Sequence, residues 1–124
     1  METFEQFVAA INSHDPETLG RLMAADHVFV DGLGNRVQGS LAMKAGWAGY
    51  FALCPDYWLR VDTCLEGNGT VLAVGEAGGT IDRQTWKIPA AWKAMILDGK
   101  VMEWRVFADN KPVYDILGKR KGSS

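Results

Sequence analysis

Several features that would point to a specific cellular setting are scarce in this sequence. It has only two cysteines, Cys54 and Cys64, too few for a disulfide framework, so we expect two free thiols, with a single disulfide as the alternative. With 13 Lys and Arg against 15 Asp and Glu, it lacks the basic surplus that binds nucleic acids or anionic membranes. No apolar run approaches the length of a membrane span, and the N-terminus METFEQFVAA does not resemble a signal peptide. We therefore expect a cytoplasmic protein with no nucleic-acid or membrane partner.

The motifs of metal and cofactor chemistry are also missing. The two histidines, His14 and His27, are too far apart for a helical i, i+4 pair, and there is no Cys-x-x-Cys. The sequence contains no phosphate-binding loop, no dinucleotide fingerprint and no Gly-x-Ser-x-Gly nucleophile elbow. We expect neither a metal nor a cofactor.

The remaining composition is that of a small globular protein. The chain has 124 residues, of which 48% are hydrophobic, enough to build one core. We expect a single domain over residues 1–117, followed by a flexible basic tail over residues 118–124, which ends in KRKGSS.

The first half of the chain has helical patterns. Phe4, Phe7, Val8 and Ile11 recur on one helical face. Asp15-Pro16-Glu17 then predicts the start of a second helix, with Asp as the N-cap and Pro at the first helical position. A third helix is predicted from Ser40 to about Leu53. Gly46 and Gly49 weaken it, which indicates close packing against another element.

The second half predicts strands joined by tight turns. The predicted strands are Trp58–Glu66, Thr70–Ala77, Trp86–Leu97 and Lys100–Asp109. Gly67–Gly69 and Asp98-Gly99 are typical of hairpin turns, and Gly78-Gly79 is expected to end the second strand. In the third strand, Pro89 indicates an edge position or a bulge. The buried face of this strand is expected to carry Trp86, Ile88, Ala90, Trp92, Ala94 and Ile96.

Helices followed by a run of strands predict the α+β class, with helices packed on one face of an antiparallel sheet. A curved sheet wrapped around the N-terminal helices would form a cone with a pocket at its open end. Pockets of this kind are common sites for small ligands.

One carboxylate stands out in the stretch VFVDGLGNRVQG, residues 28–39. The short strand His27–Asp31 places Phe29 and Asp31 on one face and Val28 and Val30 on the other. Two interpretations stay open. Asp31 can cap the glycine-rich turn that follows it, as Asp before Gly often does. It can also project into an apolar pocket and act as a general base.

The order of these motifs resembles the nuclear-transport-factor-2-like superfamily, and within it the SnoaL-like and ketosteroid-isomerase-like proteins. The resemblance covers roughly residues 3–117. It is carried by HDPETLGRLMAADHVFVDGLGNRVQG, by the helix ending YFALCPDY and by LDGKVMEWRVFADNKPV. It implies a cone-shaped fold with a pocket between helices and sheet, and a homodimer formed through the outer face of the sheet.

The resemblance also bears on chemistry, residue by residue. The proton-shuttling Asp of ketosteroid isomerases falls at Asp31, but their oxyanion-binding Tyr falls at Phe7 and their protonated Asp at Trp92 or Lys93. Both oxyanion donors are thus missing, which argues against steroid isomerisation itself. The Asp-Arg-Asp set of the related epoxide hydrolases is incomplete, because Val106 stands where an Asp is needed. Proton transfer at an activated carbon, as in SnoaL-like polyketide cyclases, needs only one well-placed carboxylate.

We therefore predict a cofactor-independent protein that binds an apolar carbonyl-type small molecule. Asp31 is the candidate catalytic base of an isomerase- or cyclase-type reaction. The indole N–H groups of two tryptophans could replace the missing Tyr, whereas Trp47 and Trp58 are assigned to core or dimer packing. The predicted ligand-binding residues are Phe7, Phe29, Tyr50, Trp92 and Trp104. The alternative is a non-catalytic ligand-binding or dimeric interaction module on the same fold. An Asp31 that caps the turn would favour this alternative.

Overall fold

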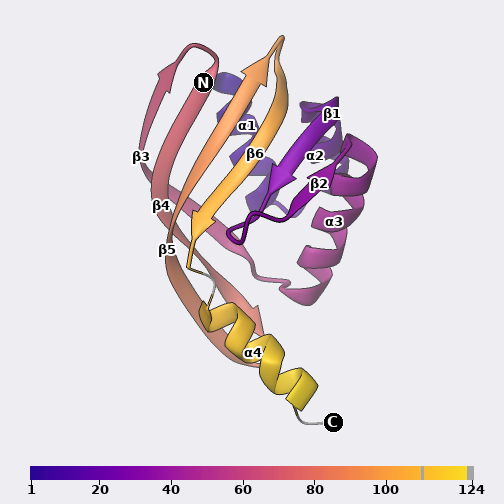
Figure 1. Cartoon of the computed structure of the whole chain (residues 1–124), viewed down its shortest axis with the longest axis vertical. Helices are drawn as coiled ribbons and strands as arrows, with labels where there is room; N and C mark the ends of the chain where they lie inside the picture. The colour runs from indigo at the N-terminus through magenta and orange to yellow at the C-terminus, as the bar shows by residue number, and fades with distance from the viewer. Residues whose placement is uncertain (110, 123–124) are drawn as a thin grey trace.

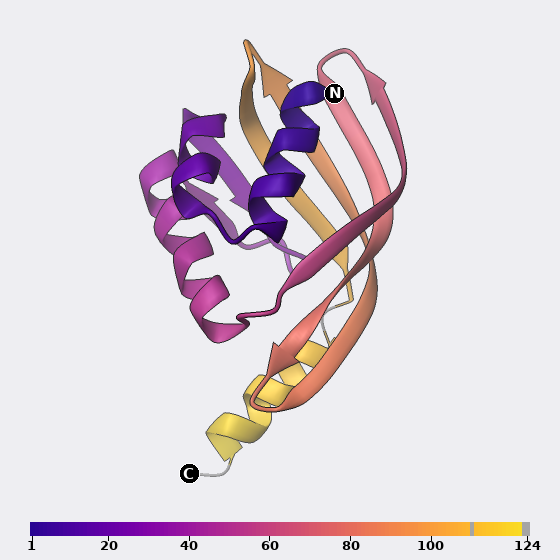
Figure 2. The same cartoon turned by 180° about the vertical axis from the view of Figure 1, so that it is seen from behind.

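A computed structural model describes residues 1–109 and 111–122, with residues 119–122 described by their backbone alone. The helices are α1 (Glu2–Asn12), α2 (Pro16–Leu22), α3 (Ser40–Leu53) and α4 (Lys111–Gly122). The strands are β1 (Met23–Val30), β2 (Arg36–Gln38), β3 (Trp58–Gly67), β4 (Thr70–Ile81), β5 (Gln84–Leu97) and β6 (Lys100–Ala108). A curved sheet holds α1, α2 and α3 against its concave side, and α4 lies beyond the end of β6 (Figures 1 and 2). The boundary expected between domain and tail at residue 118 falls inside α4.

The six strands form one open sheet in the order β2-β1-β6-β5-β4-β3. This confirms the predicted α+β class and the curved sheet around the N-terminal helices. The expectation of a wholly antiparallel sheet is wrong in one place, since β1 pairs with β6 in parallel. After β1 the chain forms β2 and α3 and then builds β3 to β6 as an antiparallel meander, whose last strand lies beside β1.

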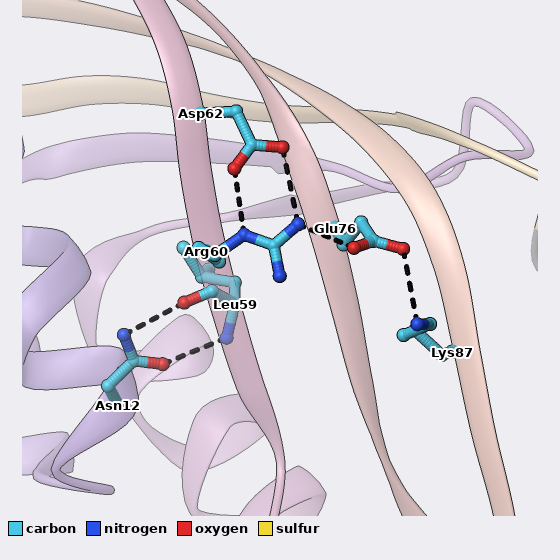
Figure 3. A network of polar contacts seen from close by, with 6 residues as sticks. All are labelled: Asn12, Leu59, Arg60, Asp62, Glu76 and Lys87. Carbon is cyan, nitrogen blue, oxygen red and sulfur yellow. Dashed lines mark hydrogen bonds and ion pairs between the residues drawn. The ribbon is translucent and has the colours of Figure 1, made fainter.

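The N-terminal helices are fixed by the residues that predicted them. Asp15 caps α2, with its side chain accepting a hydrogen bond from the Thr18 N–H at 3.1 Å. Phe4, Phe7 and Ile11 bury the inner face of α1. At the end of α1, the Asn12 amide pairs with both backbone groups of Leu59 in β3, at 3.0 and 2.9 Å (Figure 3).

Glycines in β4 and α3 do not have the structural roles that the sequence predicted for them. Gly78-Gly79 does not end the strand, because β4 continues to Ile81. A Cβ at Gly78 would lie 2.8 Å from the Trp58 ring, and one at Gly79 would overlap the Cys54 sulfur. The chain between α3 and β3 therefore crosses β4 at close range here. The packing predicted for Gly49 of α3 is absent, since nothing lies within 4 Å of its Cβ position.

The hairpin turns are partly as expected. Asn68-Gly69 and Asp98-Gly99 have positive φ at both residues, as the sequence predicts. Asp82-Arg83 makes the same kind of turn, with φ of 51° and 67°, although neither residue is a glycine. Pro89 is exposed and lies just beyond the end of the β5–β6 pairing, which starts at Ala90, so it is locally on an edge.

The outer face of the sheet carries two kinds of side chain. A polar network joins β3, β4 and β5, in which Arg60 donates to Asp62 and Glu76, and Glu76 pairs with Lys87 (Figure 3). Next to it is a group of half-exposed apolar side chains, which we call the outer apolar patch: Leu72, Val74, Met95 and Phe107.

Three smaller features concern the cysteines, the start of α4 and the length of the helices. Cys54 and Cys64 are both free, as predicted. Asp109 accepts a hydrogen bond from the Lys111 N–H at 3.0 Å and so caps the start of α4. Within residues 1–109 and 111–122, no helix is long and apolar enough to cross a membrane.

Candidate functional site

A cavity of about 290 Å³ lies between α3, the concave side of the sheet and α4. Its volume is near the lower end of the range for small-molecule pockets, about 300–1,000 Å³. The wall is drawn from most elements of the fold and is largely apolar. It consists of Phe29, Asp31, Gly32, Met43, Gly46, Trp47, Tyr50, Tyr57, Ala77, Trp86, Ile88, Ala90, Trp92, Trp104, Val106, Ala108, Val113, Tyr114 and Leu117.

The alternation of the strands places the predicted residues on the cavity side. Phe29 and Asp31 line the cavity from the end of β1, and Trp92 and Trp104 line it from β5 and β6. Tyr50 lines it from α3. Period-2 spacing was sufficient to find the strand residues, because each strand has one face toward the helices.

Phe7 is the predicted ligand-binding residue that lies outside this wall. It is fully buried in the core, and its ring centroid is 4.8 Å from that of Trp104. The indole of Trp104 stands between α1 and the cavity. Phe7 therefore supports a wall residue from behind.

Several wall residues were not assigned to the site from the sequence. Trp47 was assigned to packing, yet it both packs on Phe51 at 5.5 Å between ring centroids and lines the cavity. Trp86 shares the buried face of β5 with Trp92, so the same alternation could have found it. The α4 residues Val113 and Leu117 had no signal in the sequence, because their role depends on where α4 docks.

The Asp31 carboxylate lies at the edge of the cavity and also holds its own turn. Its Oδ1 accepts hydrogen bonds from the N–H groups of Leu33 and Asn35, each at 2.9 Å. Its Oδ2 accepts one from the Asn35 side-chain amide at 3.1 Å. A carboxylate has about four acceptor positions, so one remains for another donor. Asp31 thus combines features of both interpretations: it caps the turn and contributes to the wall.

Two tryptophans of the wall carry buried hydrogen-bond donors without partners. The buried indole nitrogens of Trp47 and Trp104 have no hydrogen-bond partner among the described residues. A buried donor without a partner costs about 1–3 kcal/mol, which a ligand acceptor could recover.

Burial raises the pKa values of Tyr50 and Tyr57 far above their usual range, so both phenols stay protonated at working pH. Neither phenol can serve as the base.

The wall contains one carboxylate and no basic side chain among the described residues. His27 is buried elsewhere, and its Nδ1–H donates to the Val101 carbonyl at 2.8 Å. Glu103 and Arg105 face outward, where Glu103 lies 3.3 Å from Lys93 and Arg105 stacks over Phe107. Among the described wall residues, Asp31 is therefore the candidate for an acid–base step.

A comparison with known protein families identifies the family of this chain. A model described as the SnoaL-like domain matches residues 4–111. The chain belongs to the SnoaL-like domain family. No curated protein matches its sequence.

Solved structures agree with this SnoaL-like assignment. A provisionally named SnoaL-like polyketide cyclase from Shewanella denitrificans OS-217 has a TM-score of 0.84 at 15% identity, covering 95% of this chain and 96% of that one. An LEH-like epoxide hydrolase from M. tuberculosis has a TM-score of 0.80 at 17% identity, covering 94% and 85%. A protein from Catenulispora acidiphila DSM 44928 with a ketosteroid isomerase-like fold, in complex with trimethylamine, has a TM-score of 0.78 at 20% identity, covering 85% and 83%. These likenesses establish the nuclear-transport-factor-2-like fold, and proteins with several different descriptions share it.

Proposed function

We propose that this SnoaL-like protein binds an apolar, carbonyl-bearing small molecule in the cavity between α3, the sheet and α4. One observation carries the proposal: an aromatic wall that includes two buried indole N–H groups, those of Trp47 and Trp104, without partners. The apolar wall provides affinity by burying the body of the ligand. The indole N–H groups are donors from which a carbonyl oxygen can accept hydrogen bonds.

Binding can be tested with 2-acetylnaphthalene, a neutral aromatic ketone, by isothermal titration calorimetry. Trp47→Phe keeps an aromatic ring and removes one N–H group. We expect its affinity to fall about two- to tenfold, the range for one hydrogen bond. Trp58→Phe is the matched control, since Trp58 does not line the cavity. Absence of binding to the wild type, or equal losses in both variants, would contradict the proposal.

Proton transfer by Asp31 is the second candidate function. It is favoured by the position of Asp31, the sole carboxylate of the described wall, beside aromatic side chains such as Phe29. The capping hydrogen bonds of Asp31 favour the alternative, a binding module without catalysis. The two candidates differ in whether a bound ketone loses a proton from its α-carbon.

Deuterium exchange at the methyl group of 2-acetylnaphthalene, followed by NMR in D₂O, separates them. If Asp31 is a base, Asp31→Asn binds the ketone but exchanges it about 10²–10⁴ times more slowly. The double variant Asp31→Asn/Asn35→Asp serves as a control for the structure of the turn. It keeps a carboxylate–amide pair across the turn but moves the charge four residues along the chain. An equal exchange rate in the wild type and Asp31→Asn would eliminate the catalytic role and leave the binding role.

Two further expectations accompany this proposal. We propose that two copies associate through the outer apolar patch, which presents Val74 and Phe107 about half exposed. We also propose a cytoplasmic location, supported by the two free cysteines.

A further inference from the structure

The charges of the cavity wall are unbalanced. Asp31 is its one carboxylate, and no Lys, Arg or His is found among the described wall residues. The Asp31 carboxylate accepts three hydrogen bonds, all from N–H groups of its own turn, and takes part in none of the ion pairs of the described chain. The cavity edge therefore carries a negative charge that no neighbouring cation neutralises.

The remainder of the wall adds to this preference for positive charge. Eight of its 19 residues are aromatic, including four tryptophans. The faces of aromatic rings are electronegative and attract cations, tryptophan most strongly. Boxes of aromatic rings are a recognised means of binding quaternary ammonium groups. An anionic ligand would meet the Asp31 carboxylate and the aromatic wall, with no cation among the described wall residues to compensate.

We propose that the carbonyl-bearing ligand of this cavity is also an organic cation, with an amine or quaternary ammonium group at the Asp31 end of its apolar body. This inference rests on the proposed binding function and specifies the charge of the ligand. The apolar body occupies the space walled by Trp92 and Trp104. The Asp31 carboxylate acts as the ionic partner of the ammonium group.

The test uses three naphthalenes substituted at the same position: (2-naphthylmethyl)trimethylammonium, 2-acetylnaphthalene and 2-naphthoate. Their affinities for the full chain are measured by isothermal titration calorimetry at two salt concentrations. We expect the cation to bind about tenfold more tightly than the ketone, within the range for desolvated cation–π contacts. The anion should bind most weakly. Added salt should reduce the preference for the cation, because it screens the Asp31 charge.

Two variants test whether the preference for the cation arises at Asp31. Asp31→Asn should lower the ratio of cation affinity to ketone affinity, leaving the part of the preference that the aromatic rings contribute. Asp26→Asn removes the same charge from an exposed position of β1 outside the wall and should leave the ratio unchanged. The wild-type ratio alone decides the proposal even if Asp31→Asn does not fold.

Equal or weaker binding of the cation relative to the ketone would overturn this inference while leaving the proposed binding function intact. Binding of the anion as tightly as the cation would also overturn it. If none of the three compounds binds, the proposed function fails as well. A ratio that responds equally to both variants would show a general charge effect and would contradict a site at Asp31.

Discussion

His27 is a buried histidine with one ring nitrogen unused. Its Nδ1–H donates to the Val101 carbonyl, while its Nε2 has no partner among the described residues. Burial lowers the pKa of His27, and the hydrogen bond to Val101 and the Glu103 carboxylate oppose this only in part. The neutral ring is therefore the form that the folded protein accommodates.

This predicts a specific pH dependence of stability. Above the unfolded pKa of about 6.5, His27 is neutral in both states and the folded protein keeps its full stability. As the pH falls below that value, the unfolded chain takes up the proton more readily, so the free energy of unfolding decreases.

His27→Asn removes the titrating ring while an Asn amide can still donate to Val101. The variant should lose less stability than the wild type between pH 7 and pH 5, as measured by urea unfolding. His14→Asn serves as the control, since the His14 ring bonds to the Tyr57 carbonyl at a part-buried site. Parallel pH profiles for the wild type and His27→Asn would show that His27 contributes nothing.

Individual residues also show how far the sequence could predict the site. Alternation along the strands placed Phe29, Asp31 and Trp104 on the correct side, because this depends only on the period of a strand. The position of Phe7 could not be predicted in this way. Whether a buried helix residue reaches the cavity or backs a wall residue depends on the size of its neighbour, here the indole of Trp104.

Among the elements, α3 and β4 contain glycines with opposite roles. Gly49 is exposed in the middle of α3, and a Cβ there would meet nothing within 4 Å. Gly79 is buried in β4, and a Cβ there would overlap the sulfur of Cys54 and approach Asp56.

The same substitution should therefore change stability in opposite directions. Gly49→Ala should stabilise the protein by about 0.5–1 kcal/mol, since alanine loses less conformational entropy in a helix. Gly79→Ala should destabilise it by about 1–3 kcal/mol through overpacking. Urea unfolding of both variants checks the pair, and a shift of the same sign in both would contradict this description of the packing.

The elements that the sequence missed share a dependence on tertiary contacts. The turn at Asp82-Arg83 lacks the glycine that marks Asp98-Gly99, and it is set by the β4–β5 hairpin that it closes. The short strand β2 is exposed throughout and exists because β1 offers an edge for pairing. The docking of α4 beside the cavity likewise cannot be deduced from its own sequence.

At the scale of the whole molecule, the outer apolar patch is the feature that a second copy would cover. Val74, Ala91 and Phe107 are register partners across β4, β5 and β6. Val74 is 51% exposed and Phe107 48% exposed in the single chain. Exposed apolar clusters of this kind mark interaction surfaces.

We expect the wild type to have twice the 13.6 kDa mass of the chain in size-exclusion chromatography with light scattering. Val74→Lys should shift it to the monomer, because it places a charge in the centre of the patch. Leu41→Lys, at a highly exposed position on α3, should leave the mass unchanged. A monomeric wild type at high concentration would refute the dimer.

The central claim is that the cavity binds a small molecule against its tryptophans. The most direct test follows the five indole N–H signals in a ¹H–¹⁵N NMR spectrum during titration with 2-acetylnaphthalene. Trp47, Trp86, Trp92 and Trp104 line the cavity and should shift, whereas Trp58 lies outside it and should not. Unchanged indole signals at saturating ketone, or a shift of Trp58 as large as the others, would contradict the claim.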